Sequence, residues 1–172
     1  DEVGLPQAPE EISDEVVRRM LDRYRVDLPL IDGAVAVVRE LARSFPLAVA
    51  SSSNRPLIDA VLDTAGIADC FAVTVSSEEV ARGKPAPDVF LLAANRLTVP
   101  VLDCIVIEDS LLGIEAAKAA GMRVIGFDPQ LPAASPLWAA EGAVARSLDE
   151  LVREADVVSL HTPLTKETRQ MI

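Results

Sequence analysis

The stretch CIVIEDSLLGIEAAKAAGMRVIGF, residues 104–127, decides the fold of this chain. An apolar run over 104–108 ends in two carboxylates, and an alanine-rich stretch with helical spacing follows and closes at Gly121. A second apolar run, 123–127, comes soon after that glycine. Apolar runs of this length are typical of strands buried on both faces, and two of them joined by a helix form a βαβ unit. The stretch therefore predicts an α/β fold with a parallel sheet.

The same alternation extends toward the N-terminus. Apolar runs at 46–50 and 71–75 alternate with helical stretches at 55–66 and 87–97, and the first of these stretches ends at Gly66 in the position of a helix C-cap. Polar residues that follow the strands of such a sheet gather at its carboxyl edge, where the chemistry of α/β proteins is found. Further upstream, Ser13 predicts the N-cap of an amphipathic helix over 13–24.

Length and composition restrict the class of protein. The chain has 172 residues, enough for one α/β domain and little more, and 50% of them are hydrophobic while only 3% are aromatic. A net charge of −11 argues against a nucleic-acid-binding surface and against an anionic-membrane anchor. No run of about 18 apolar residues occurs, and the first residues of the sequence lack the basic and apolar regions of a signal peptide. We therefore expect small molecules as partners, with no nucleic acid and no membrane.

The two cysteines, Cys70 and Cys104, lack the CxxC spacing of a zinc site, and the chain has one histidine. Their apolar surroundings predict free thiols in a reduced, cytoplasmic compartment.

The first polar group at a strand end is the serine run 51–53 with Asn54, which separates an apolar run from the helix after it. A helix N-terminus with a nearby hydroxyl favours a phosphate group. The alternative is that Ser53 or Asn54 only caps the helix.

Two further groups lie at the ends of later strands. Lys84 is held between Gly83 and Pro85, which suits a charge that neutralises a phosphoryl group in a fixed place, although most loop lysines are solvated. Glu108 and Asp109 end a buried strand and offer the hard oxygen ligands that suit Mg²⁺. The alternative for these acids is helix capping in contact with water.

The motifs SSSNR (51–55), GKPAPDVF (83–90) and VIEDSLLGIEAAKAAGMRVIGF (106–127) occur in order within about 28–128. They resemble the second, third and fourth motifs of the haloacid dehalogenase (HAD) superfamily, in the branch of phosphoglycolate phosphatase and β-phosphoglucomutase. The resemblance implies a Rossmann-like fold and Mg²⁺-dependent phosphoryl transfer through an aspartyl-phosphate. The expected enzyme is a phosphatase or phosphomutase that acts on a small phosphorylated metabolite.

Carried over to this chain, the resemblance implies a phosphate site. Ser51 would hydrogen-bond the transferring phosphoryl group, with the backbone N–H of Ser52 close by. Lys84 would neutralise the phosphoryl oxygens, and Arg55 would contact the substrate. Ser51 and Lys84 are therefore the expected catalytic residues.

The resemblance also implies a metal site and a division of the chain. Asp109 would bind Mg²⁺ and Glu108 would orient the water molecules of the metal. Residues 1–27 would be the remnant of a helical cap, and 28–146 the core of the fold without its first strand. The first motif of the family, with its nucleophilic Asp-x-Asp, does not occur in this sequence.

Because the strand of the first motif lies in the middle of the sheet in this family, its absence predicts open strand edges beside it. We therefore expect an incomplete fold that is inactive as an isolated chain. Completion by a missing N-terminal segment, or self-association, would close the open edges.

The tail 147–172, with the text ADVVSLHTPLTKETRQMI at its end, resembles an internal stretch of NAD-dependent D-2-hydroxyacid dehydrogenases. The Gly-x-Gly-x-x-Gly fingerprint of a dinucleotide site is absent, and His161 aligns with a strand-end histidine of that family and not with its catalytic one. Two alternatives to a phosphatase follow, namely a fragment of such a dehydrogenase or a non-catalytic fusion remnant.

Overall fold

The computed structural model of the chain describes residues 8–126, 143–144 and 159–160. Short strands alternate with helices in this part of the chain. The helices are α1 (Pro9–Val26), α2 (Ala34–Leu41), α3 (Arg55–Ala65), α4 (Asp88–Leu97) and α5 (Leu111–Ala119). The strands are β1 (Leu47–Ser51), β2 (Phe71–Ser76), β3 (Ile105–Glu108), β4 (Arg123–Gly126), β5 (Ala143–Val144) and β6 (Ser159–Leu160). Single turns of 3-10 helix form η1 (Ala68–Cys70), η2 (Ser77–Glu79) and η3 (Val101–Asp103).

The strands form one sheet in the order β2-β1-β6-β3-β4-β5, and every pair in it is parallel. All carboxyl ends therefore lie at the same edge. The predicted α/β fold with a parallel sheet and flanking helices is confirmed, and it has the Rossmann-like form of the HAD superfamily.

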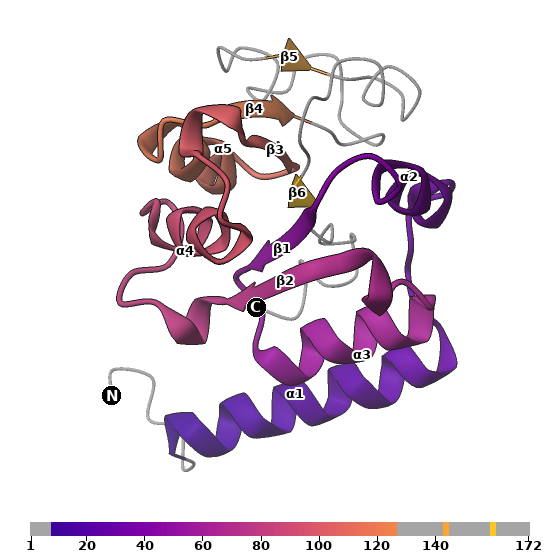
Figure 1. Cartoon of the computed structure of the whole chain (residues 1–172). Coiled ribbons are helices and arrows are strands. Elements are labelled where there is room, and N and C mark those ends of the chain that lie inside the picture. The colour runs from indigo at the N-terminus through magenta and orange to yellow at the C-terminus, as the bar shows by residue number, and fades with distance from the viewer. Residues whose placement is uncertain (1–7, 127–142, 145–158, 161–172) are drawn as a thin grey trace.

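Both faces of the sheet are covered by helices (Figure 1). On β1, Ala48 and Ala50 belong to the cluster that contains residues of α4 and α5, whereas Leu47 and Val49 belong to the cluster that contains residues of α2 and α3. Since successive side chains of a strand point to opposite faces, a strand covered on both sides is apolar along the part that the helices cover. This requirement explains the unbroken apolar runs that predicted the strands.

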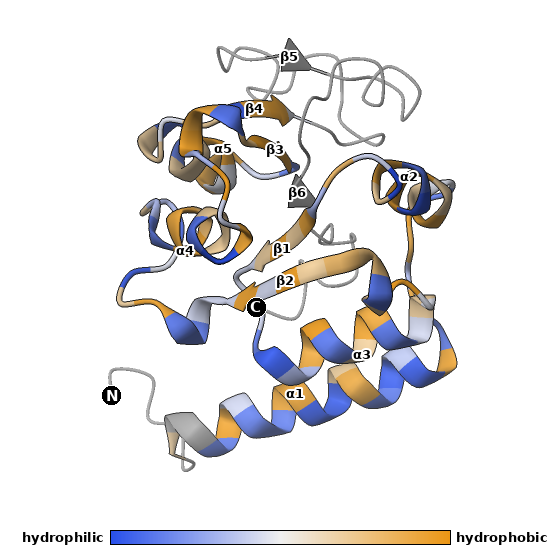
Figure 2. Cartoon of the chain, viewed as in Figure 1, coloured by the Kyte–Doolittle hydropathy of each residue, from blue (hydrophilic) through white to orange (hydrophobic). Residues whose placement is uncertain are grey.

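Helix α1 begins at Pro9 and not at the predicted N-cap Ser13. Proline is well placed in the first turn of a helix, and the N–H of Ala8 donates to the Glu11 carboxylate at 3.3 Å. These features move the start of the helix by one turn. Helix α1 lies along α3, and the surface of α1 carries both apolar and charged residues (Figure 2).

The predicted C-terminal glycines take left-handed backbone conformations. Gly66 is the C-cap of α3 with φ 65°, as predicted, whereas Gly121, with φ 77°, follows the α5 C-cap Ala120 by one residue. Glycine adopts this region without strain because it has no Cβ atom that could clash with the backbone. The N–H of Gly121 donates to the carbonyl of Lys118 at 2.9 Å, which closes the last turn of α5.

Strand β6 corrects in part the expectation of open edges in the centre of the sheet. Ser159 pairs with Ala48 of β1 and with Val106 of β3, so β6 lies between these strands. Backbone N–H and C=O groups of buried strands require hydrogen-bond partners, and two residues of the tail pair there with Ala48 and Val49 of β1 and with Val106 of β3. The tail therefore contributes to the same sheet as the core.

In the described ranges, no helix is both long enough and apolar enough to cross a membrane. The thiols of Cys70 and Cys104 are free, and Cys104 is buried.

Candidate functional site

Ser51 and Glu108 end their strands at the same edge of the sheet. Ser159 pairs with Ala48 of β1 and with Val106 of β3, so these three residues lie side by side in the sheet. Ser51 follows Ala48 by three residues, and Glu108 follows Val106 by two. Since β1 and β3 are separated by one strand, the two ends are about 10 Å apart. The structure thus brings the predicted serine and acidic groups to one carboxyl edge.

Lys84 is brought to the same edge by an ion pair with Glu108. Its Nζ lies 2.7 Å from Glu108 Oε2, and the two side chains are 4% and 0% exposed. The ammonium also lies 4.6 Å from the centroid of the Phe90 ring on α4. Lys84 is therefore a buried charge held in a fixed place and not the solvated lysine of the alternative interpretation.

Burial lowers the pKa of Lys84 from its ordinary value, and the nearby carboxylates of Glu108 and Asp109 oppose this effect by favouring the charged ammonium. A charge removed from water requires a partner of opposite sign. Glu108 meets this requirement.

The other carboxylate oxygen of Glu108 connects the ion pair to α5. Oε1 accepts hydrogen bonds from the Ser110 hydroxyl at 2.8 Å and from the Ser110 N–H at 3.2 Å. The Ser110 hydroxyl in turn accepts from the Gly113 N–H at 3.0 Å, which caps the helix. The bond from Ser110 to Glu108 depends on the fold of the turn and had no signal in the sequence.

Glu108 and Asp109 are the neighbouring carboxylates that could hold a metal ion. Within the described part of the chain, no group of three or more histidine, cysteine, aspartate or glutamate side chains is arranged to hold one. Mg²⁺ is, however, commonly bound through one or two carboxylates together with water and substrate phosphate oxygens. Half-buried Asp109 beside the buried Glu108 fits such a donor set.

The serine loop after β1 is held by hydroxyl groups at the end of β2 and directly after it. Ser51 is 2% exposed, and its Oγ accepts from the Ser53 N–H at 3.0 Å. The Ser76 hydroxyl donates to the Ser53 carbonyl at 2.8 Å, and the Ser77 hydroxyl donates to the Ser52 carbonyl at 2.9 Å. These bonds fix the backbone of the loop beside the carboxyl edge.

The alternative that Ser53 or Asn54 caps α3 is confirmed in the position of the cap but not in its side-chain bond. Asn54 is the N-cap residue, but no side-chain capping bond is made, and its Nδ2 donates to Glu78 at 2.7 Å. Glu78 also accepts from the backbone N–H of Arg55 at 2.9 Å, so a carboxylate from η2 satisfies the start of this helix. The sequence offered no signal for this contact because 23 residues separate the two groups.

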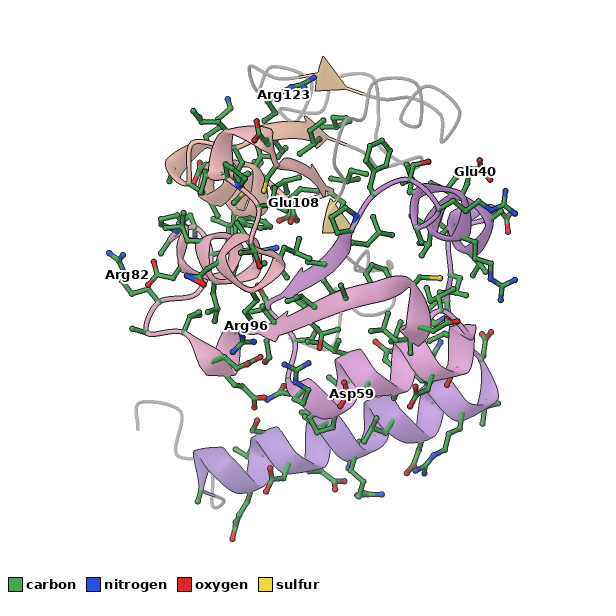
Figure 3. The ribbon with its side chains drawn as sticks, viewed as in Figure 1. Glu40, Asp59, Arg82, Arg96, Glu108 and Arg123 are labelled. Atoms are coloured by element: carbon green, nitrogen blue, oxygen red, sulfur yellow. The ribbon has the colours of Figure 1, made fainter. Side chains whose placement is uncertain are left out.

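Arg55 contacts the end of β2 through its guanidinium group. It donates to the carbonyl of Thr74 at 2.9 Å, to the Thr74 hydroxyl and to the carboxylate of Glu79. The same carboxylate accepts from Arg96 of α4 at 2.7 Å, and Arg96 is labelled beside β2 in Figure 3. In this structure the guanidinium of Arg55 is engaged in joining α3, β2 and η2, and its contact with a substrate stays a prediction.

The contacts of Glu79 with Arg55 and Arg96 predict that the stability of the protein depends on pH. Hydrogen bonding from the Ser76 N–H, assisted by Arg96 and Arg55, lowers the pKa of Glu79. A carboxyl group with a lowered pKa stabilises the fold above its ordinary value of about 4.3 and loses this effect as the pH falls through the lowered value. Glu79→Gln should therefore lower the free energy of unfolding by about 1 kcal/mol at pH 7 and have less effect in acid.

Urea denaturation at pH 7 and near pH 3 measures this difference. The exposed Glu115→Gln on α5 is the control, with little change expected at either pH. An equal loss for Glu79→Gln at both pH values would contradict the role of its charge.

Comparison with known proteins shows what this chain is similar to. A model of the haloacid dehalogenase-like hydrolase family matches residues 2–121. The bifunctional riboflavin kinase/FMN phosphatase of Arabidopsis thaliana is 43% identical over 120 residues, which are 69% of this chain and 31% of that protein. Fructose-1-phosphate phosphatase YqaB of Escherichia coli strain K12 is 38% identical over 120 residues, which are 70% of this chain and 62% of that protein. This chain spans less than two thirds of both relatives.

A solved structure shows the same fold. The crystal structure of CbbY from Rhodobacter sphaeroides in complex with phosphate superposes with a TM-score of 0.76 at 28% identity, covering 86% of this chain and 67% of that one. A model of the NAD-binding domain of D-isomer-specific 2-hydroxyacid dehydrogenases matches residues 113–172. This second match begins in α5 and not near 147, so it overlaps the first match over residues 113–121. Both families can match this overlap because an alanine-rich helix followed by a short buried strand is common in proteins with parallel α/β sheets.

Proposed function

Because this chain belongs to the haloacid dehalogenase-like hydrolase family, we propose that its described residues form the phosphate-binding and Mg²⁺-binding part of a site for phosphoryl transfer. The observation that carries the proposal is the buried ion pair of Lys84 and Glu108 at the carboxyl edge of the sheet. A buried ammonium at this place can neutralise phosphoryl oxygens without reorganising when they arrive.

The residues around the ion pair would bind either the phosphoryl group or the metal ion. The Oγ of Ser51 accepts a backbone N–H, so its proton can be donated to a phosphoryl oxygen, and the backbone N–H of Ser52 lies next to it in the chain. Asp109 would be the direct ligand of Mg²⁺, with Glu108 beside it. The ion, when bound, would supply further neutralisation of phosphoryl charge.

We propose a small phosphorylated metabolite as the substrate class. Support comes from the relatives, which are named as phosphatases of FMN and of fructose 1-phosphate. Phosphatase and phosphomutase activities share the residues described above. The free thiols of Cys70 and Cys104 are consistent with a proposed cytoplasmic location.

The division of the chain into a cap remnant (1–27), a core (28–146) and a tail (147–172) is part of the same proposal. Helix α1 lies within the first of these segments and packs on α3. The sequence contains no Asp-x-Asp, and we therefore propose that this chain binds phosphate but does not turn over a substrate by itself.

Titration with inorganic phosphate and Mg²⁺, followed by NMR shift changes, tests the binding. Ser51→Ala should weaken the affinity for phosphate about tenfold, because a hydrogen bond to a charged group contributes about 1.5 to 3 kcal/mol. Ser77→Ala is the control, since the Ser77 hydroxyl donates to the Ser52 carbonyl and not into the site. Equal affinities for Ser51→Ala and wild type would contradict the assignment of Ser51.

Two further measurements separate the alternatives. Release of phosphate from an aryl phosphate in the presence of Mg²⁺ should stay at background, and turnover that Asp109→Ala abolishes would overturn the proposed inactivity. NADH should not bind, because the dinucleotide fingerprint is absent from the sequence. Binding of NADH without binding of phosphate would favour the dehydrogenase interpretation.

A further inference from the structure

Gly113, in the first turn of α5, lies against the side chain of Glu108. A Cβ atom added to Gly113 would be 2.0 Å from Glu108 Cδ, 2.3 Å from Cγ and 2.3 Å from Oε2. Non-bonded carbon atoms rest about 3.5 to 4.0 Å apart. The Glu108 carboxylate therefore occupies the space that any other residue at position 113 would fill.

Glu108 cannot move aside without losing its partners. Its side chain is fully buried, with Oε2 bonded to Lys84 and Oε1 bonded to Ser110. Displacement away from α5 would break the bonds to Ser110, and rotation would break the bond to Lys84. An exposed glutamate would swing into water instead, at little cost.

The backbone conformation of Gly113 does not explain the glycine. Within the described residues the glycines with positive φ are Gly33, Gly66 and Gly121. Glycine inside a helix is less favourable than alanine because its backbone loses more freedom on folding. Replacing such a glycine with alanine normally stabilises a helix. At Gly113 we expect the same replacement to destabilise the protein.

We propose that Gly113 is a positioning residue that acts through Glu108. Its missing side chain lets the Glu108 carboxylate lie across the start of α5, where it holds the Lys84 ammonium at the carboxyl edge and accepts from Ser110. The importance of this for phosphoryl transfer rests on the proposed function, whereas the packing and the ion pair can be tested without it.

The test compares Gly113→Ala with Gly83→Ala, since a Cβ at Gly83 meets no atom within 4 Å. Gly113→Ala should lower the melting temperature by at least about 5 °C. It should also remove the ammonium NMR signal of Lys84, which is slow to exchange in the buried pair and is assigned by its absence in Lys84→Met. Gly83→Ala should retain both.

A second background keeps the proposal falsifiable if Gly113→Ala does not fold. In Lys84→Met/Glu108→Ala the clash partner is gone and no buried charge is left, so adding Gly113→Ala should leave the melting temperature unchanged or raise it. A similar fall in both backgrounds would overturn the proposal, because Gly113 would then serve helix packing alone. Retention of the Lys84 signal in Gly113→Ala would also overturn it. Neither result depends on phosphate binding, so a failure of the proposed function is recognised separately.

Discussion

Glu108→Gln should lower the free energy of unfolding by about 3 to 5 kcal/mol. The change is isosteric, but it leaves the Lys84 ammonium in a site where that side chain is 4% exposed and its partner is 0% exposed. Removal of one member of a buried ion pair costs the desolvation of the charge that remains. Urea denaturation at pH 7 measures the loss.

Glu40→Gln is the matched control for this prediction. Glu40 pairs with Arg43 at 2.6 Å, but the two side chains are 58% and 74% exposed, so its loss should change stability by less than about 1 kcal/mol. Figure 3 shows Glu40 on α2, apart from Glu108 in this view. Equal effects of the two substitutions would contradict the buried character of the Lys84 pair.

Replacing both members of the pair separates stability from function. Lys84→Met/Glu108→Leu removes both charges and fills a similar volume, and such replacements are often neutral for stability. We expect this variant to recover most of the stability that Glu108→Gln loses. Its affinity for phosphate should nevertheless fall, and recovery of both properties would contradict the proposed role of Lys84.

Phe90→Ala should also destabilise the protein by about 3 to 5 kcal/mol. Phe90 is 2% exposed and is the largest fully buried side chain of the described residues. Its removal would leave a cavity between α4 and the sheet, and it would take away the ring that lies 4.6 Å from the Lys84 ammonium. The substitution therefore affects the core and the site together.

Phe45→Ala is the control for Phe90→Ala, because Phe45 is only partly buried and packs on the other face of the sheet. Its loss should be smaller, and the ammonium signal of Lys84 should persist. Phe90→Leu should keep most of the stability while losing the ring beside Lys84. An effect of Phe90→Ala no larger than that of Phe45→Ala would contradict the packing seen in the structure.

Most of the strands and helices could be predicted from the sequence. The apolar runs coincide with most of β1 to β4, because strands that are covered by helices consist mainly of apolar residues. The start of α1 was predicted at the wrong residue. A serine followed by acidic residues is compatible with a helix N-cap, but it does not show whether the helix begins further upstream. The proline at the first position and the bond from the Ala8 N–H to Glu11 decided the outcome.

The grouping of the candidate residues at one edge of the sheet was predictable, but the partners of their side chains were not. That Ser51, Lys84 and Glu108 reach one edge follows from the rule that parallel strands end together. The direction of the Arg55 side chain toward Glu79, and the close approach of Gly113 to Glu108, depend on residues that meet only after folding. No local spacing contains this information.

By itself, the sequence determined the α/β class, the carboxyl-edge position of the polar groups and the resemblance to the HAD superfamily. These properties follow from backbone periodicity and from motifs of a few residues. Only the tertiary structure decided that Lys84 is buried against Glu108, 24 residues away, and that β6 lies between β1 and β3. The reason is physical. The free energy of a buried charge or an unpaired strand depends on which distant groups replace water around it, and that is settled when the sheet and its helices pack.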